Sequence, residues 1–164
     1  MEVNNSILNK VEVDSKLLDD VVDKIVSQYT GALEDYVNSI KTFLEDGSET
    51  LTLSDLNNMA LRTSSYLFFL SSNLEKVGIR NAVAEAIRDE KYNHEYSNNA
   101  TGTIADKQAY ALAQVKEEEM IRIVFDKAYR ILKNRYAATE KLVDTIRKVV
   151  SARMSEMEIS NRVS

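Results

Sequence analysis

Residues 103–160, TIADKQAYALAQVKEEEMIRIVFDKAYRILKNRYAATEKLVDTIRKVVSARMSEMEIS, decide the fold of this chain. The stretch contains no proline and no glycine, and its apolar residues recur with the three- and four-residue spacing of one helix face. Thr103 and Asp106 form the capping-box pattern that opens many helices. We therefore predict one helix over residues 103–160. It would be roughly 85 Å long at 1.5 Å per residue, so it must bend, break or pack against other copies.

The remaining sequence predicts two more long helices. Acidic residues and a regular apolar stripe indicate a helix over residues 14–46. A second capping-box pattern, Thr52-x-x-Asp55, opens a helix over residues 53–96 that could bend near Gly78. Residues 1–13 alternate only weakly and predict an N-terminal arm or a short strand. We expect an all-α fold over residues 1–164, a single domain built as an elongated bundle of three main helices with a long C-terminal helix.

Composition limits the classes of protein to which this chain can belong. The 164 residues include no cysteine, which excludes disulfides and thiolate metal sites. The longest run of bulky apolar residues, residues 66–70, is far too short to span a membrane. The first residues lack the basic and apolar segments of a signal peptide. We therefore expect a cytoplasmic protein that does not enter the membrane.

Few residues in the chain are suited to catalysis or metal binding. The only histidine, His94, lies near Glu90 and Glu95 but has no further candidate ligands around it. Glu117, Glu118 and Glu119 are consecutive helix residues, which point about 100° apart and cannot meet on one ion. No nucleophile triad order and no glycine-rich phosphate loop is present in the sequence. We predict no metal, no cofactor and no enzymatic activity.

Charge is distributed unevenly along the sequence. Residues 1–60 carry 4 basic and 12 acidic residues, residues 61–120 carry 7 and 9, and residues 121–164 carry 10 and 5. A basic C-terminal third can bind an anionic partner such as nucleic acid, or it can meet the acidic N-terminal third of another copy. A solvated helix surface is the third interpretation.

The basic residues of the predicted third helix are interleaved with Tyr129 and Tyr136. Cations for phosphates and aromatic rings for bases are the combination that binds single-stranded nucleic acid. The two tyrosines also continue the apolar stripe, so packing inside a helical seam is the competing interpretation. The candidate nucleic-acid-binding cations of this helix are Lys107, Lys127, Arg130 and Lys133.

The layout of residues 80–158 resembles that of the UvsY family of tailed-phage recombination mediators. A helix with basic residues, RNAVAEAIRDEKY (residues 80–92), leads into a polar loop that contains a glycine. A long helix follows, with ADK at residues 105–107, FDKAY at residues 125–129 and IRKVVSARM at residues 146–154. The similarity covers about half of the chain, and it consists of spacing and residue character.

This resemblance implies a ring-like homo-oligomer that binds single-stranded DNA, displaces the single-strand-binding protein and helps to load a RecA-like recombinase in the host cytoplasm. It implies DNA contacts from Arg80, Arg88 and Lys91, although Glu85, Asp89 and Glu90 dilute their charge. The C-terminal helix would supply the contacts between subunits, through Leu132, Tyr136, Val143, Ile146, Val150 and Met154. The alternative hypothesis is a non-enzymatic phage structural, adaptor or inhibitor protein that uses helical protein–protein contacts only.

Overall fold

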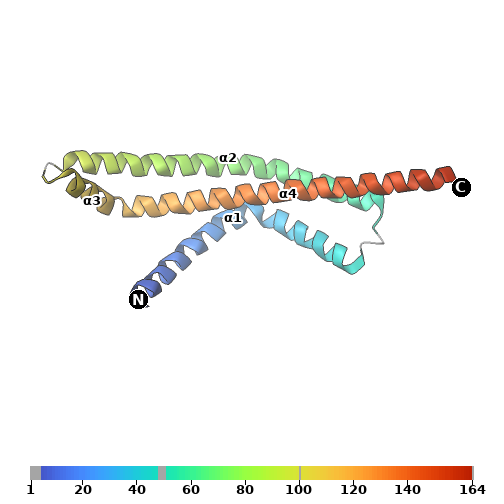
Figure 1. The fold of residues 1–164 in the computed structure, drawn as a ribbon, viewed down its shortest axis with the longest axis horizontal. Coiled ribbons are helices and arrows are strands. Elements are labelled where there is room, and N and C mark those ends of the chain that lie inside the picture. Colours follow the sequence, from blue (N-terminus) through green and yellow to red (C-terminus); the bar gives the residue numbers. More distant parts are fainter. Residues whose placement is uncertain (1–4, 48–50, 100, 164) are drawn as a thin grey trace. The chain divides into compact units, whose positions relative to one another are not determined.

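The computed structural model describes residues 5–47, 51–99 and 101–163, and their fold is all-α, as predicted (Figure 1). The helices are α1 (Asn5–Gly47), α2 (Leu53–Asn98), α3 (Ile104–Gln114) and α4 (Lys116–Val163), and the described residues include no strand. Within these same residues, no helix combines the length and the apolar character needed to cross a membrane.

The first helix begins earlier than the sequence predicts. Residues 5–13 belong to α1, so the prediction of an N-terminal arm or strand is wrong for them, and residues 1–4 lie outside the described part. No glycine or proline in this segment stops the helix from extending towards the N-terminus. At their other predicted boundaries, α1 and α2 agree with the prediction to within two residues.

Both predicted capping boxes are present. Thr52 and Asp55 close one box, with the Thr52 amide 3.0 Å from Asp55 Oδ2 and the Asp55 amide 3.1 Å from Thr52 Oγ1. Thr103 and Asp106 close the other, with corresponding distances of 2.9 and 3.3 Å. These bonds satisfy amide donors that the first turn of a helix leaves without partners, and so they fix where α2 and α3 begin.

The predicted third helix is two helices. Val115 interrupts it with φ −102° and ψ 19°, so α3 ends at Gln114 and α4 begins at Lys116. Ala111 of α3 and the capping residue Val115 are buried, and the buried side chains of α4 begin at Val124. Val124 lies nine positions after Val115, about two and a half helical turns, which would place these two side chains on opposite sides of one straight helix. The turn at Val115 allows both side chains to be covered.

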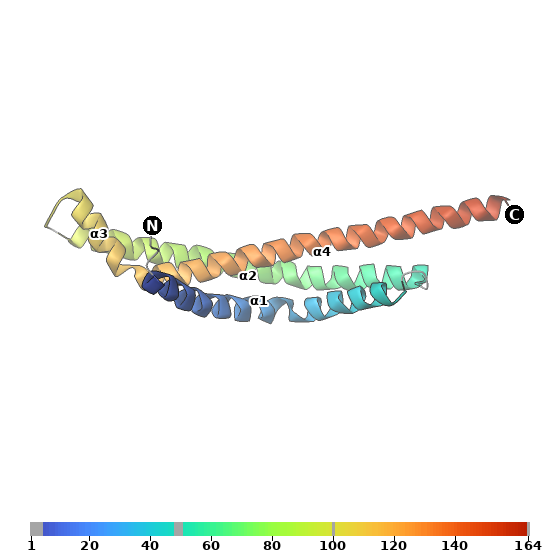
Figure 2. The same cartoon turned by 60° about the horizontal axis from the view of Figure 1, so that its bottom comes forward.

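The helices contribute to two compact units. Unit 1 comprises Met1–Ser27 and Leu74–Ile131, and unit 2 comprises Gln28–Asn73 and Leu132–Ser164. In unit 1 the second half of α2 lies alongside the first half of α4 (Figure 2). α2 passes through Gly78 without interruption, and a Cβ atom at this position would lie 3.1 Å from Cε2 of Tyr129. Because Gly78 has no side chain, α2 and α4 can approach closely at this position, and α2 continues past it.

The core of unit 2 is formed by apolar residues of α2 and α4. Its cluster of buried residues is Leu51, Leu56, Ala60, Leu67, Val143, Ile146 and Val150. One apolar stripe of α2 is buried or half-buried at every position, and it consists of Leu56, Met59, Ala60, Leu67, Leu70, Leu74 and Val77. Thr30 of α1 is also fully buried, and Arg135 donates a 2.7 Å hydrogen bond to its hydroxyl oxygen. Arg135 also pairs with Glu34, which links α4 to α1 within the unit.

Candidate functional site

Arg88 and Lys91, two of the predicted DNA-binding cations, face carboxylates of α4 in unit 1. Arg88 Nε lies 3.1 Å from Glu119 Oε2, and Lys91 Nζ lies 2.7 Å from Glu118 Oε1. Arg122 shares Glu119 at 2.6 Å. The hydrogen bond from Arg122 lowers the pKa of Glu119, and the bond between Lys91 and Glu118 raises the pKa of the lysine. These ion pairs link α2 to α4, so Arg88 and Lys91 already have anionic partners within the chain, and DNA contact by them stays a prediction.

The other predicted cations are distributed over both units. Lys127 pairs with Asp19 at 2.6 Å, and Arg130 pairs with Asp126 at 3.0 Å, so these two engage carboxylates as Arg88 and Lys91 do. Arg80 and Lys133 are exposed and Lys107 is half-buried. The two tyrosines that accompany them are half-buried, with Tyr129 against Gly78 and Tyr136 against the core of unit 2. Seam packing therefore describes Tyr129 and Tyr136 better than base stacking does.

The residues predicted to join subunits lie mainly in the core of their own chain. Leu132 is fully buried, and Val143, Ile146 and Val150 belong to the core cluster of unit 2, against which Tyr136 packs. Side chains that their own chain already covers have little area left for a second copy, which argues against a subunit contact for the four buried residues, and the contact by the half-buried Tyr136 stays a prediction. Met154 is the exception, with half of its surface exposed.

The second half of α2 turns an unexpected face outwards. The sequence suggests that the apolar positions from residue 79 to residue 87 continue the buried stripe, with Arg88 and Lys91 on the polar side. In unit 1 the reverse holds, because Ile79, Val83 and Ile87 are 64%, 52% and 52% exposed. The ion pairs of Arg88 and Lys91 require their side of the helix to face α4, which leaves the more apolar side uncovered.

The two most exposed phenylalanines of α2 are neighbours in unit 2. Phe68 is 74% exposed and Phe69 is 67% exposed, and their rings meet edge-on with centroids 5.6 Å apart. Large aromatic side chains are normally buried in the core of a fold, so this exposed pair is a candidate interaction site. Phe68 and Phe69 point to different hollows, one on each side of α2.

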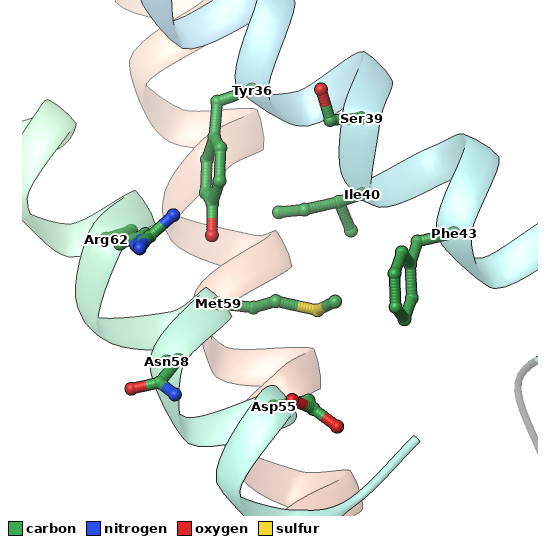
Figure 3. Close-up of a pocket in the computed structure, with 8 residues that line it drawn as sticks. All are labelled: Tyr36, Ser39, Ile40, Phe43, Asp55, Asn58, Met59 and Arg62. Carbon is green, nitrogen blue, oxygen red and sulfur yellow. The ribbon is translucent and has the colours of Figure 1, made fainter. Parts of the chain in front are cut away.

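Phe69 borders a surface shared by α1 and α2. A hollow of about 330 Å³ is lined by Tyr36, Arg62, Ser65, Tyr66 and Phe69. Tyr36 and Arg62 also line an adjoining hollow of about 280 Å³, into which Ile40, Phe43 and Met59 project (Figure 3). We call Tyr36, Arg62, Tyr66 and Phe69 the aromatic–arginine surface.

Arg62 is the cation of the aromatic–arginine surface. It hydrogen-bonds Tyr36, and burial raises the pKa of that phenol above its usual range despite the nearby positive charge. The rings of Tyr36 and Tyr66 lie 5.5 Å apart. Asp55 lines the adjoining hollow, but its carboxylate is engaged by the amide and hydroxyl of Thr52. No carboxylate among the described residues forms an ion pair with Arg62, so its charge is available to an anionic ligand.

Phe68 borders a second hollow, of about 580 Å³, between α2 and α4. Lys141 and Arg147 contribute cations to its wall, and Glu140 and Asp144 contribute anions. Asp144 lies 3.8 Å from Arg147, whereas Lys141 has no ion pair among the residues that the structure describes. We call this the α4 hollow. With two basic and two acidic residues, its wall carries no net charge, and Lys141 is the cation in it that no ion pair among the described residues engages.

The candidate site of unit 2 combines two exposed rings with a cation on each side. This arrangement can stack planar groups on Phe68 and Phe69 while Arg62 or Lys141 contacts an anion. The sequence did not predict this site, because the bulky residues 66–70, which lie between serines, are typical of a segment packed between helices. The available signal was the position of Phe68 and Phe69 relative to the buried stripe, since Leu67 and Leu70 occupy the covered positions.

No protein-family model, curated protein or solved structure matches this chain.

Proposed function

We propose that this protein binds single-stranded DNA as a homo-oligomer, with Phe68 and Phe69 stacking on bases. Arg62 and Lys141 would contact the phosphates on either side of the two rings. The observation that carries the proposal is the exposed pair of rings with one cation-bearing hollow on each side of α2. The resemblance to recombination mediators supports the same function, in which the bound strand is passed to a RecA-like recombinase in competition with the single-strand-binding protein.

The charges of the site suggest a modest affinity for each copy. Glu140 and Asp144 offset Lys141 and Arg147 in the α4 hollow, which leaves Arg62 as the cation least compensated by acids. Several such sites on one strand would reinforce one another, because the second contact is made at a high effective concentration. Binding by an assembly is therefore the form of this function that the electrostatics favour.

A titration of a labelled oligothymidine, followed by fluorescence anisotropy at several salt concentrations, tests the proposal. Base–aromatic stacking contributes about 1–3 kcal/mol per base, so Phe69→Ala is expected to weaken binding by about 5- to 150-fold. Arg62→Ala should reduce the dependence of affinity on salt by about one phosphate contact. Ile159→Ala is the matched control, since this exposed residue of unit 2 lies outside both hollows.

Wild-type protein that does not bind at 50 mM salt would overturn the proposal. Equal losses of affinity in Phe69→Ala and Ile159→Ala would also count against the proposal, because they would show that any exposed apolar side chain contributes to DNA binding. The mediator step is tested separately, by measuring whether the protein speeds the assembly of a RecA-type filament on DNA coated with single-strand-binding protein.

A second candidate function is that of an assembly or adaptor protein that acts through helix–helix contacts alone. The uncovered face of α2 in unit 1, with Ile79, Val83 and Ile87, favours it. This function predicts a defined oligomer whose mass does not change when oligonucleotide is added. Light scattering with and without oligothymidine distinguishes it from the DNA-binding function.

A further inference from the structure

We infer that the outward face of α2 in unit 1 is a two-fold contact between two copies of this chain, with the two helices antiparallel and crossing near Val83. The inference names the surface for the self-association that the proposed function includes, and in that sense it depends on that function. We call Ile79, Val83 and Ile87 the α2 outer ridge.

The α2 outer ridge has the geometry of a helix-packing surface. Its members follow one another every four residues, and each has more than half of its surface exposed, at 64%, 52% and 52%. Together with the flanking positions 76 and 90, they follow the mixed three- and four-residue spacing of helices that pack at about +20°, which keeps the two helices side by side along this length. Ala82 and Ala86 are exposed beside the ridge, and such small side chains let a second helix approach closely. Exposed apolar residues in a row make this face a candidate contact. The row Val13, Leu17 and Val21 of α1 has the same spacing, but lysines lie seven residues on either side of its centre, so it lacks the opposite end charges of the α2 outer ridge.

Charges at the two ends of the ridge identify the partner as a second copy. Lys76 lies seven residues before Val83, and Glu90 lies seven residues after it. Both are exposed, and neither forms an ion pair among the described residues. A two-fold axis at Val83 places Lys76 of each copy beside Glu90 of the other. A contact of this kind is made twice, because both copies use the same surface.

The same charges select the antiparallel direction. A parallel pair would bring Lys76 against Lys76 and Glu90 against Glu90, and such like-charge contacts are unfavourable. In the antiparallel pair, the remaining cation near the ridge, Arg80, falls opposite Ala86, which carries no charge. The surface is therefore complementary to itself in one orientation only.

Disulfide trapping tests the position of the axis. The chain contains no cysteine, so Val83→Cys introduces a single thiol. Two copies of a residue beside a two-fold axis come close enough to form a disulfide. Mild oxidation of dilute Val83→Cys should give a covalent dimer, whereas Val11→Cys should remain largely monomeric on a denaturing gel, because Val11 is an exposed valine of unit 1 that belongs to no such apolar row. Equal cross-linking of the two variants would overturn the proposed axis.

Charge reversal tests the orientation. Lys76→Glu and Glu90→Lys should each raise the dimer dissociation constant by about 5- to 30-fold in sedimentation velocity, because each creates two like-charge contacts. The double variant, Lys76→Glu with Glu90→Lys, should return to within about twofold of wild type. If the double variant weakens the dimer by the sum of the two single effects, the antiparallel pairing is overturned. If the wild-type protein is monomeric, the contact itself is overturned.

These measurements are made without DNA, so their outcome is separate from the test of the proposed function. A dimer that passes both tests but does not bind oligothymidine would leave the contact in place and remove the DNA-binding proposal. Far-UV circular dichroism of each variant checks that the helices are intact, which the exposure of all the substituted positions leads us to expect.

Discussion

Two glycines inside long helices should respond in opposite ways to the same substitution. Gly31 lies in α1, where an added Cβ atom would have no other atom within 4 Å. Alanine restricts the unfolded chain and favours the helix, so Gly31→Ala should raise the free energy of unfolding by about 0.5–1 kcal/mol. Gly78 lies in α2, where the added Cβ atom would be 3.1 Å from Cε2 and 3.6 Å from Cδ2 of Tyr129.

The contact with Tyr129 removes the benefit at Gly78. Carbon atoms pack best about 3.5–4.0 Å apart, so the ring would have to move by several tenths of an ångström. Forcing an extra methyl group into packed side chains costs about 1–3 kcal/mol. We therefore expect Gly78→Ala to be less stable than Gly31→Ala by this amount, and to fall between wild-type stability and about 2 kcal/mol below it.

Urea denaturation followed by circular dichroism measures both variants, at one protein concentration because self-association would add to the apparent stability. The control is Tyr129→Leu, which removes the ring. In that background, Gly78→Ala should become as favourable as Gly31→Ala. Equal stabilisation by the two alanines in the wild-type background would refute the explanation that Gly78 is required for the approach of α4.

Three further predictions concern the core, a helix cap and the pH dependence of stability. Leu132→Ala should lower the free energy of unfolding by about 2–5 kcal/mol in urea titrations, because Leu132 is fully buried. Thr103→Ala breaks the box with Asp106 and should cost about 0.5–2 kcal/mol, with faster amide exchange in the first turn of α3. Arg122 holds the pKa of Glu119 below its usual value, so the stabilisation is present above about pH 4.5 and is lost as the pH falls through the lowered pKa. Glu119→Gln should therefore flatten the acid side of the stability–pH curve.

Local sequence signals predicted the parts of the fold that depend on neighbouring residues. The all-α class follows from composition, and the starts of α2 and α3 follow from the hydroxyl and carboxylate pairs at Thr52–Asp55 and Thr103–Asp106. These features involve side chains three residues apart. No knowledge of tertiary packing is needed to recognise them.

The features that sequence reasoning missed depend on contacts between distant segments. Glu118 and Glu119 are 27 and 31 residues from their partners Lys91 and Arg88, and it is these pairs that turn the apolar row of α2 outwards. Periodicity shows that a helix has an apolar face, but it does not show which face a neighbouring helix will cover. The exposure of Phe69 and the burial of the predicted subunit contacts have the same origin.

The length of the segment between Val115 and Val124 decides whether α3 and α4 remain two helices. At present Val115 and Val124 lie half a turn out of phase along the helix. Two inserted residues would lengthen the interval to eleven positions, about three full turns, and two deleted residues would shorten it to seven, about two full turns. Either change would bring these two buried side chains onto one side and favour a single straight helix, whereas substitutions that preserve the length would leave them on opposite sides. Here the count of residues, more than their identity, determines the path of the chain.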